Sequence, residues 1–411
     1  MKFENPPSML LRIIVPVSVI QTCMWGLLYY TYAVLIGPVG QDIGVGVKEL
    51  TGLFTVAMLI SGLVGIPIGR FADANGGKIP LIGGCLLASA MFIAWRFATT
   101  FLELSLIWCG IGFSMALIFQ MGNIIFVQAI PAYFQRAVVI CSLFTGFAAA
   151  IFVPMTEYSY HRYGLHLTLE AFAVICILCS AIGFLIIPNS TSDINSGRKK
   201  YMPDIVAKHS VIGRAIRSAR FWAVAIALGS NGAISTILAV HLVSILDTKG
   251  YQASEIATAI AIGGPSQIGV RVLLAFFYGR YSSSLMLGLM ALTLQLVAMI
   301  LLTISDASAS FAWAAFAFGI TNGIAGGLML IVGALVTTDI FGMNDYGQIQ
   351  GILKMITTIS RAIAPSAVAL AFYTINLYQQ ISNALIYVAI ISIAAFVFSL
   401  SPKKALSNIS Q

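Results

Sequence analysis

The stretch IGGPSQIGVRVLLAFFYGRY, from Ile262 to Tyr281, is an apolar run long enough to cross a bilayer and carries an arginine, Arg271, near its middle. A charged side chain at that depth costs roughly several kcal/mol unless it faces a polar cavity. An arginine near a helix end can extend to the headgroups, but about 12 Å of helix separate Arg271 from Gly279 and Arg280. We therefore interpret Arg271 as a functional residue.

The composition of the whole chain assigns its class before any motif does. Hydrophobic residues make up 59% of the 411 residues and charged residues only 9%, with a mean hydropathy of +0.96. These values exclude a soluble globule and indicate a polytopic membrane protein. Continuous apolar runs between short polar breaks favour helices over the alternating strands of an outer-membrane barrel, so we expect an all-α fold. The run after Arg12 is too long for a signal-peptide core, so no cleaved signal is expected.

Runs that can span about 30 Å of hydrocarbon recur along the chain. They begin near Leu11, Leu50, Ile79, Phe101, Ala137, Leu165, Phe221, Ser254, Leu285, Phe311, Ile349 and Ile381. These are twelve expected transmembrane helices in two sets of six, separated by residues 189–220, which carry seven Lys and Arg residues and no long apolar run. We predict a six-helix bundle over 1–188, a cytoplasmic linker over 189–220, and a second six-helix bundle over 221–411 that ends in a short cytoplasmic tail.

Positive charge predicts the orientation, because Lys and Arg accumulate in cytoplasmic loops. Of the 22 Lys and Arg residues, fifteen fall on the side of the linker, four fall on the other side, and Arg271, Lys354 and Arg361 lie inside expected helices. Both termini are therefore expected in the cytoplasm, with the chain in the inner (cytoplasmic) membrane. The net charge of +8 follows from this topology and requires no nucleic-acid partner. We expect a small-molecule substrate and the lipid bilayer as partners, and a monomer.

Metal, redox and hydrolytic chemistry find little support in the residues. The six cysteines lie in or beside apolar runs of the first half and are interpreted as small buried hydrophobic residues. Cys176 and Cys179 form a C-x-x-C, but without a second pair or a nearby histidine it is a weak metal or redox signal. No His, Cys, Asp and Glu residues cluster with ligand spacing. We expect no metal, no cofactor and no enzymatic activity.

An internal repeat supports the two bundles. Gly69 and Arg70 follow the second run, and Gly279 and Arg280 follow the eighth run, 210 residues later. The same offset aligns the loop around Arg136 with the loop around Tyr346. Two parallel repeats of this kind predict a substrate site between them, near the middle of the membrane.

The stretch GIPIGRFADANGGK, from Gly65 to Lys78, resembles the cytoplasmic loop signature of the major facilitator superfamily. The signature's glycines, acid and base stand at Gly69, Asp73, Gly76 and Lys78, whereas Ala74 replaces a usual base. The glycines allow a tight turn, and Asp73 can cap a helix or pair with a basic group. With the twelve runs, the resemblance covers essentially the whole chain. It implies two pseudo-symmetric six-helix bundles that transport a solute by alternating access.

Two more stretches resemble the monocarboxylate-porter and oxalate/formate-exchanger branch of that superfamily. They are WGLLYYTYAVLIGPVGQDIGVGVKELTGLF, from Trp25 to Phe54, and HLVSILDTKGYQASEIATAIAIGGPSQIGVR, from His241 to Arg271. The resemblance implies that Arg271, as the basic residue of helix eight, binds a substrate carboxylate. Proton-coupled members carry an aspartate one turn earlier, where this chain has Gln267. This departure argues against proton coupling by that route.

The eleventh run, GILKMITTISRAIAPSAVAL, carries two further cations, Lys354 and Arg361, which are seven residues apart and share nearly one helix face. The exchanger branch has a substrate-binding lysine in this helix, and Lys354 lies close to that place. Two alternatives stay open, since Lys354 can snorkel near the cytoplasmic end and Arg361 can be held by backbone carbonyls at a Pro365 kink.

The fourteen acidic residues all fall in loops or near helix ends, so no carboxylate is expected deep in the membrane to neutralise these bases. Cations that face a cavity without acidic partners favour an anionic substrate, and the planar fork of Arg271 suits a carboxylate or a phosphorylated group.

Polar residues within other runs are candidates to line the cavity. They are Tyr29, Tyr30, Gln120, Asn123, Asn231 and Asn322, although Tyr and Asn in apolar helices also serve as interfacial anchors or interhelical contacts. The expected gating residues are Gly69, Arg70, Asp73, Gly76, Lys78 and Arg136. Glu157 and His241 are the candidates for proton coupling, and a packing role is the alternative for His241.

These residues together predict a transporter of a small organic anion, a carboxylate, that works by exchange or uniport. The alternatives are an efflux pump for amphipathic compounds or drugs, a proton-coupled monocarboxylate symporter, and a transporter-like receptor that senses a ligand without moving it.

Overall fold

A computed structural model of the chain describes residues 7–187, 210–277, 283–307, 312–343, 345–371 and 377–400. Within these ranges the backbone forms helices joined by turns and short connections, without a β-strand. The prediction of an all-α fold is confirmed. Three predictions fall outside these ranges: the first part of the linker, up to residue 209, the repeat partner Gly279–Arg280, and the position of both chain ends.

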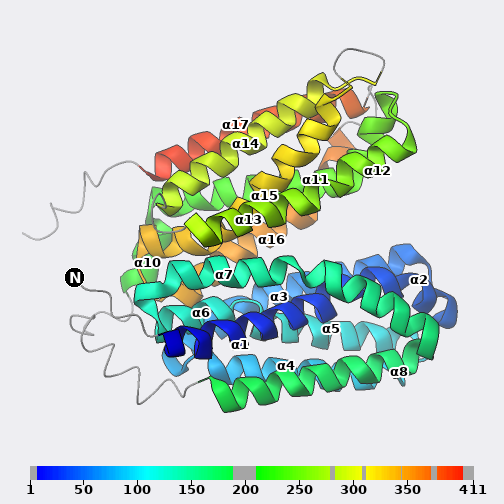
Figure 1. Cartoon of the computed structure of the whole chain (residues 1–411), viewed down its shortest axis with the longest axis vertical. Coiled ribbons are helices and arrows are strands. Elements are labelled where there is room, and N and C mark those ends of the chain that lie inside the picture. Colours follow the sequence, from blue (N-terminus) through cyan, green and yellow to red (C-terminus); the bar gives the residue numbers. More distant parts are fainter. Residues whose placement is uncertain are drawn as a thin grey trace, which may run out of the picture. The chain divides into compact units, whose positions relative to one another are not determined.

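The first half of the chain contains six membrane-crossing helices, several of them built from two elements (Figure 1). In chain order the elements are α1 (Pro7–Trp25), the π-helix η1 (Gly26–Tyr30), α2 (Thr31–Ile43), α3 (Val47–Asn75), α4 (Lys78–Trp95), α5 (Phe101–Ile118), α6 (Met121–Ala129), the 3₁₀-helix η2 (Pro131–Tyr133), α7 (Phe134–Gly146) and α8 (Ala148–Ile186). The first helix therefore runs through α1, η1 and α2, and the fourth through α5 and α6.

The fifth and sixth helices meet inside the long element α8, where Figure 1 shows the chain reversing its direction. The reversal occurs at Gly164, whose φ of 77° and ψ of 176° are not helical. A residue with a Cβ is strained at this φ, so glycine permits the turn. α7 and the first part of α8 form the fifth helix, and the rest of α8 forms the sixth.

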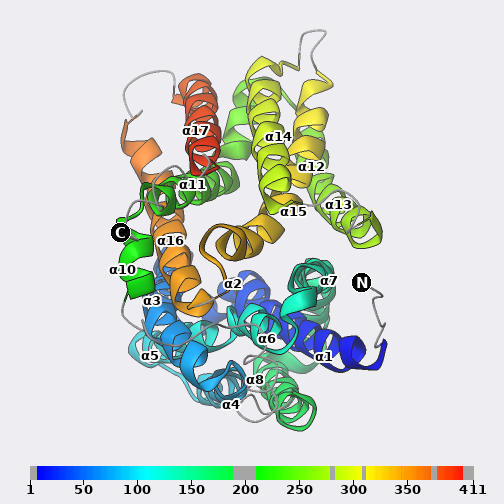
Figure 2. The same cartoon turned by 90° about the vertical axis from the view of Figure 1, so that its left-hand side faces the viewer.

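The second half begins with a short helix, α10 (Ser210–Arg217), seen in Figure 2 next to the start of α11. The remaining elements are α11 (Ala219–Thr248), α12 (Ala253–Ala261), α13 (Gly263–Phe277), α14 (Ser284–Ile304), α15 (Ala314–Phe341), α16 (Tyr346–Ala371) and α17 (Leu377–Ser399). The eighth membrane helix is built from α12 and α13, which meet at Ile262.

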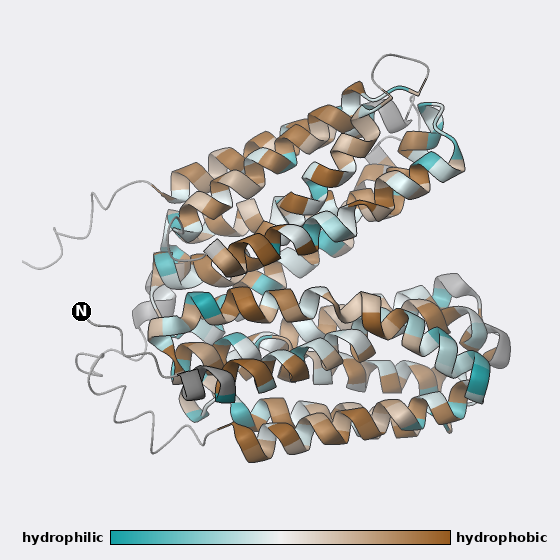
Figure 3. Ribbon diagram, in the orientation of Figure 1, coloured by the Kyte–Doolittle hydropathy of each residue, from teal (hydrophilic) through white to brown (hydrophobic). Residues whose placement is uncertain are grey.

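The described residues contain ten segments that are long and apolar enough to cross a membrane. One of these, Pro131–Ile186, contains both the fifth and sixth helices, and α16 is not among the ten. Dividing the first at Gly164 and adding α16 gives the twelve helices of the prediction, as two six-helix bundles. Figure 3 shows hydrophobic residues along most of the length of these helices.

Contacts along the chain define two compact units. The first unit contains Met1–Lys208, Arg271–Tyr278 and Thr337–Met355, and the second contains His209–Val270, Gly279–Val336 and Ile356–Gln411. The predicted boundaries at residues 188 and 220 stay a prediction.

Close backbone packing in the second unit fixes the position of the eighth helix against α15. A Cβ at Gly319 would overlap the carbonyl oxygen of Ala259, and a Cβ at Gly323 would overlap the carbonyl oxygen of Gly263. At Gly327 a Cβ would come within 2.8 Å of the carbonyl oxygen of Gln267. Three glycines spaced by four residues thus let two membrane helices approach closely.

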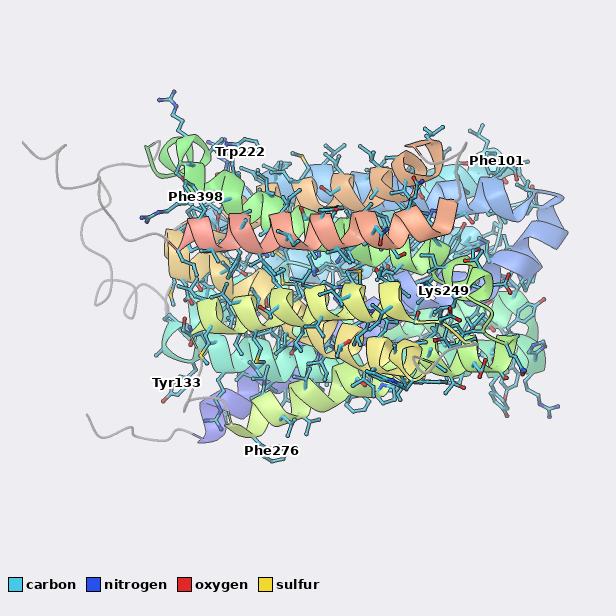
Figure 4. The ribbon with its side chains drawn as sticks, turned by 90° about the horizontal axis from the view of Figure 1, so that it is seen from above. Phe101, Tyr133, Trp222, Lys249, Phe276 and Phe398 are labelled. Atoms are coloured by element: carbon cyan, nitrogen blue, oxygen red, sulfur yellow. The ribbon has the colours of Figure 1, made fainter. Side chains whose placement is uncertain are left out.

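Lys249, labelled in Figure 4, connects the loop after α11 to the end of α14. Its Nζ donates to the carbonyl oxygens of Thr303, at 2.8 Å, and Ser305, at 3.0 Å. A cation at this end complements the negative end of the helix dipole. Burial lowers the pKa of the Lys249 ammonium, and the nearby carboxylate of Asp306 opposes that shift.

Candidate functional site

Arg271 lies in the middle of the eighth helix, in α13, and only 4% of it is exposed. Its Nη1 donates to the backbone carbonyl oxygen of Ser142 in α7, at 3.1 Å. The buried Nε has no hydrogen-bond partner among the described residues. Within the same residues Arg271 also forms no ion pair, and a described ion pair elsewhere joins Arg96 to Glu170. The guanidinium therefore keeps a buried donor and an uncompensated positive charge.

Tyr30 is the described side chain that interacts electrostatically with Arg271. It ends the π-helix η1, in which one extra residue per turn changes the direction of the side chains that follow. Tyr29 contacts Tyr30 edge to face, with ring centroids 5.1 Å apart, and contacts Trp25 at 5.4 Å. Trp25, Tyr29 and Tyr30 thus form a continuous aromatic row along the first membrane helix.

Lys354 lies at the other end of this aromatic row. Its Nζ is 5.9 Å from the ring centroid of Trp25, which is within the range of a cation–π interaction. Trp25 also stacks on Phe119 of the fourth helix, with centroids 4.0 Å apart and planes 4° from parallel. Within the first unit, therefore, Lys354 contacts one end of the aromatic row and Arg271 interacts with the other end.

Gln120, the residue after Phe119, is the next polar group in this region. It is 7% exposed, and its Oε1 has no hydrogen-bond partner within the described part of the chain. A Cβ at Gly65 would lie 2.9 Å from its Nε2, and a Cβ at Gly351 would lie 3.0 Å from the carbonyl oxygen of Gly65. Close contact between α3 and α16 at these glycines thus holds Gln120 one helical turn from Lys354.

Asn123 lies further along the fourth helix and has a different partner. Its side chain hydrogen-bonds to Tyr346, the first residue of α16, which is 1% exposed. Tyr346 also packs edge to face against Phe134, with centroids 5.6 Å apart. Asn123 therefore holds the start of α16 rather than the aromatic row.

Asp73 belongs to the predicted gating loop, and its carboxylate caps α16. One oxygen accepts the backbone N–H of Gly347 and the other accepts that of Gln348, each at 2.9 Å. An anion at this helix end is stabilised by the helix dipole and by N–H groups that lack a partner within their own helix. Of the two roles considered for Asp73, capping is the one observed.

The other predicted gating residues surround this cap or lie at the surface. A Cβ at Gly69 would overlap the carbonyl oxygen of Gly347, so only a glycine fits there. Gly76 ends α3 with a φ of 93°, which favours glycine. Lys78 begins α4 with its Nζ 5.5 Å from the ring centroid of Phe184, whereas Arg70 and Arg136 are exposed.

The remaining candidates lie in the second unit, where two of them already have packing partners. Asn322 accepts a hydrogen bond from Gln295 at 3.0 Å, so it joins two helices. His241 lies in α11 with its Nε2 3.4 Å from the carbonyl oxygen of Pro365, which can only accept. The packing role that we held open for His241 therefore has a defined partner.

Gln267, Asn231 and Arg361 complete the second unit's candidates. Gln267 packs on α15, where a Cβ at Gly326 would lie 3.2 Å from its Nε2. Asn231 is buried in α11, and at the next position a Cβ on Gly232 would lie 3.1 Å from Arg361. Arg361 is exposed and makes no hydrogen bond to a backbone carbonyl among the described residues. The carbonyl contacts expected at the Pro365 kink are therefore not seen there.

Glu157, the predicted proton carrier, is exposed and lies in the first part of α8. The six cysteines are all free thiols, four of them buried. No group of three potential metal ligands occurs within the described ranges.

Sequence reasoning missed Trp25, Phe119 and Ser142 as parts of this site. Trp25 stands four residues before Tyr29, a spacing that indicates neighbours on a helix, so a signal for it was available. Ser142 contributes a backbone carbonyl, which every residue carries, and no sequence pattern distinguishes it.

Comparison with known proteins identifies the class of molecule to which this site belongs. Residues 18–365 match the family model of the Major Facilitator Superfamily, and the chain belongs to that superfamily. No curated protein sequence matches the chain.

Two solved structures share the fold. The fucose:proton symporter FucP of E. coli superposes with a TM-score of 0.73 at 13% identity, covering 96% of this chain and 100% of that chain. The human organic anion transporter MFSD10 (TETRAN) superposes with a TM-score of 0.70 at 11% identity, with the same coverage. The chain is thus a multi-pass membrane transporter, as predicted.

Proposed function

We propose that this transporter moves a small organic anion, a carboxylate, across the cell's inner membrane by alternating access of its two bundles. The observation that carries the proposal is Arg271, buried at 4% exposure, with an unpartnered Nε and no acidic partner among the described residues. An uncompensated cation in a membrane interior is costly, and an anionic substrate removes that cost when it binds.

The neighbours of Arg271 support a carboxylate with a small organic skeleton. A guanidinium can donate two parallel hydrogen bonds to a carboxylate, and the aromatic row Trp25–Tyr29–Tyr30 offers flat apolar surfaces beside it. Lys354, against Trp25, supplies a second positive charge at the far end of the row. We assign substrate contacts to Arg271 and Lys354 first, then to Tyr29, Tyr30 and Gln120.

Exchange or uniport fits these residues better than proton symport. Gln267 cannot take up a proton, and it stands one helical turn before Arg271, where the resembling proton-coupled transporters have an aspartate. Glu157 is exposed near the end of its helix rather than beside Arg271. We propose gating through Asp73, whose cap on α16 must break if the two helices separate during transport. The excess of Lys and Arg supports a cytoplasmic position for the linker and both termini.

A ligand screen followed by a flux assay tests this function. Purified protein is heated with monocarboxylates, dicarboxylates, sugar phosphates, neutral sugars and cationic drugs, because a ligand bound by the folded state raises the unfolding temperature. Labelled uptake into proteoliposomes is then measured for every ligand that stabilises. Stabilisation and flux by carboxylates alone support the proposal. Flux of cationic drugs without preference for anions would indicate the efflux pump, and binding without flux would indicate a receptor.

A further inference from the structure

The short helix α10 (Ser210–Arg217), with sequence SVIGRAIR, has no role in the proposed transport cycle. Its apolar positions are Val211, Ile212, Ala215 and Ile216, which is the spacing of one helix face. Arg214 and Arg217 are three positions apart, as neighbours on the other face are. Of these residues, Ala215 is buried and Arg217 is exposed. The helix is therefore amphipathic, with a basic polar face.

α10 is attached to the first turn of the membrane helix α11 by three hydrogen bonds. Ser218 donates from its hydroxyl to the carbonyl oxygen of Ala215 at 2.7 Å and accepts the N–H of Phe221 at 3.2 Å. The indole Nε1 of Trp222 donates to the carbonyl oxygen of Ile216 at 2.9 Å. These bonds fix where α10 lies relative to the end of a membrane-spanning segment.

Trp222 indicates that this level is the membrane–water interface. Its side chain is 50% exposed at the start of α11, and Figure 4 shows it beside α10. Tryptophans with an exposed ring and a satisfied N–H are typical of the headgroup region. An amphipathic helix held at that level lies along the membrane surface with its apolar face toward the acyl chains.

The charge around α10 selects the kind of lipid. Residues 189–220 carry seven Lys and Arg residues and two acids, Asp193 and Asp204. Basic clusters next to a membrane helix attract anionic headgroups by about 1 kcal/mol for each charge near the surface. We propose that α10, with Arg214, Arg217 and Arg220, is a binding surface for anionic phospholipid headgroups of the leaflet that faces the linker.

The experiment measures thermal unfolding of the detergent-purified full chain as phosphatidylglycerol or phosphatidylcholine is added. Phosphatidylglycerol is expected to raise the unfolding temperature more than phosphatidylcholine, and the difference is expected to shrink with salt. In the triple variant Arg214→Gln, Arg217→Gln, Arg220→Gln, the apparent affinity for phosphatidylglycerol should fall by about fivefold for each charge removed.

Two matched variants separate this effect from misfolding and from total charge. Replacing the same three arginines by lysine keeps the charge and should keep the response to phosphatidylglycerol. Arg162→Gln removes an exposed base from the opposite side of the predicted topology and should also keep the response. A triple glutamine variant that folds and still prefers phosphatidylglycerol overturns the proposal. So does equal stabilisation by soluble glycerol phosphate, which would indicate an anion site without a membrane contribution.

Discussion

The carboxylate of Asp73 accepts the backbone N–H of Gly347 at 2.9 Å, although 274 residues separate the two in the chain. The loop after α3 thereby caps a helix of the second half of the sequence, and the neighbouring N–H of Gln348 binds the other oxygen. Hydrogen bonds to a charged group contribute about 1.5–3 kcal/mol. The cap is thus strong enough to bias an equilibrium between two arrangements of these helices.

Asp73→Asn is expected to change the rate of transport more than the affinity for substrate. The amide keeps one acceptor but loses the negative charge at the helix end, which weakens the cap by about 1–2 kcal/mol, or about 5–30-fold in the equilibrium. Initial rates and binding are measured side by side. Glu103→Gln is the matched control, because Glu103 caps its own helix α5. Equal losses of binding and transport in folded Asp73→Asn would assign Asp73 to the substrate site instead.

Arg271→Ala is expected to abolish substrate binding while the protein still folds, because the variant removes the charge that the substrate compensates. The loss should be at least about 2 kcal/mol, or about 30-fold in affinity. Arg271→Lys should recover only part of it, since lysine lacks the two-pronged donor geometry. Binding is measured by thermal shift and transport by labelled uptake. Parent-like binding and transport in Arg271→Ala would show that the central assignment is wrong.

Lys354 and Arg361 are expected to differ, although they share one helix and a sequence spacing that treats them alike. Lys354 contacts Trp25 in the aromatic row, so Lys354→Met should weaken anion binding about tenfold. Trp25→Leu should reduce the effect of Lys354→Met in a double-mutant cycle, because the two side chains interact. Arg361→Met serves as the comparison. If Arg361→Met weakens binding as much as Lys354→Met does, both cations contact the substrate.

The fold could be predicted from the sequence because membrane helices are encoded by continuous apolar runs. The expected start at Ile79 lies one residue from the start of α4, and that at Phe101 coincides with the start of α5. Even the eleventh helix, α16, was recognised despite Lys354 and Arg361, which keep it from the set of apolar spans.

The site was harder to predict, because its contacts depend on backbone groups and helix irregularities. The π-helix that turns Tyr29 and Tyr30, the Ser142 carbonyl and the N–H groups bound by Asp73 leave no mark in residue types. Asn322 is an instructive error of emphasis, because its partner Gln295 was not considered as an interhelical contact. The glycine spacing at 319, 323 and 327 was a signal that could have been used.

Gly323→Val is expected to destabilise the second unit, because its side chain would collide with the backbone of Gly263. Overpacking of this kind costs about 1–3 kcal/mol and would displace α13 together with Arg271. Gly333→Ala is the matched control in the same helix α15, since a Cβ there meets nothing within 4 Å. It should be neutral or stabilise by up to about 1 kcal/mol. Thermal unfolding of the two variants decides the matter, and equal stability would mean that the close contact has no energetic role.

Transport is expected to be electrogenic or exchanging and to proceed without an inward proton gradient. Gln267 holds no titratable proton, and the two remaining candidates lack a deep position or a free ring: Glu157 is exposed, and His241 lies 3.4 Å from the Pro365 carbonyl oxygen. Proteoliposomes preloaded with substrate are given a pH step at clamped voltage, and labelled uptake is followed. Counterflow that persists without a pH gradient is the expected result. Glu157→Gln should leave it unchanged, as should Glu49→Gln, another exposed acid near a helix end. Uptake that appears only with acid outside, and is lost in Glu157→Gln but not in Glu49→Gln, would contradict exchange and identify Glu157 as the proton carrier.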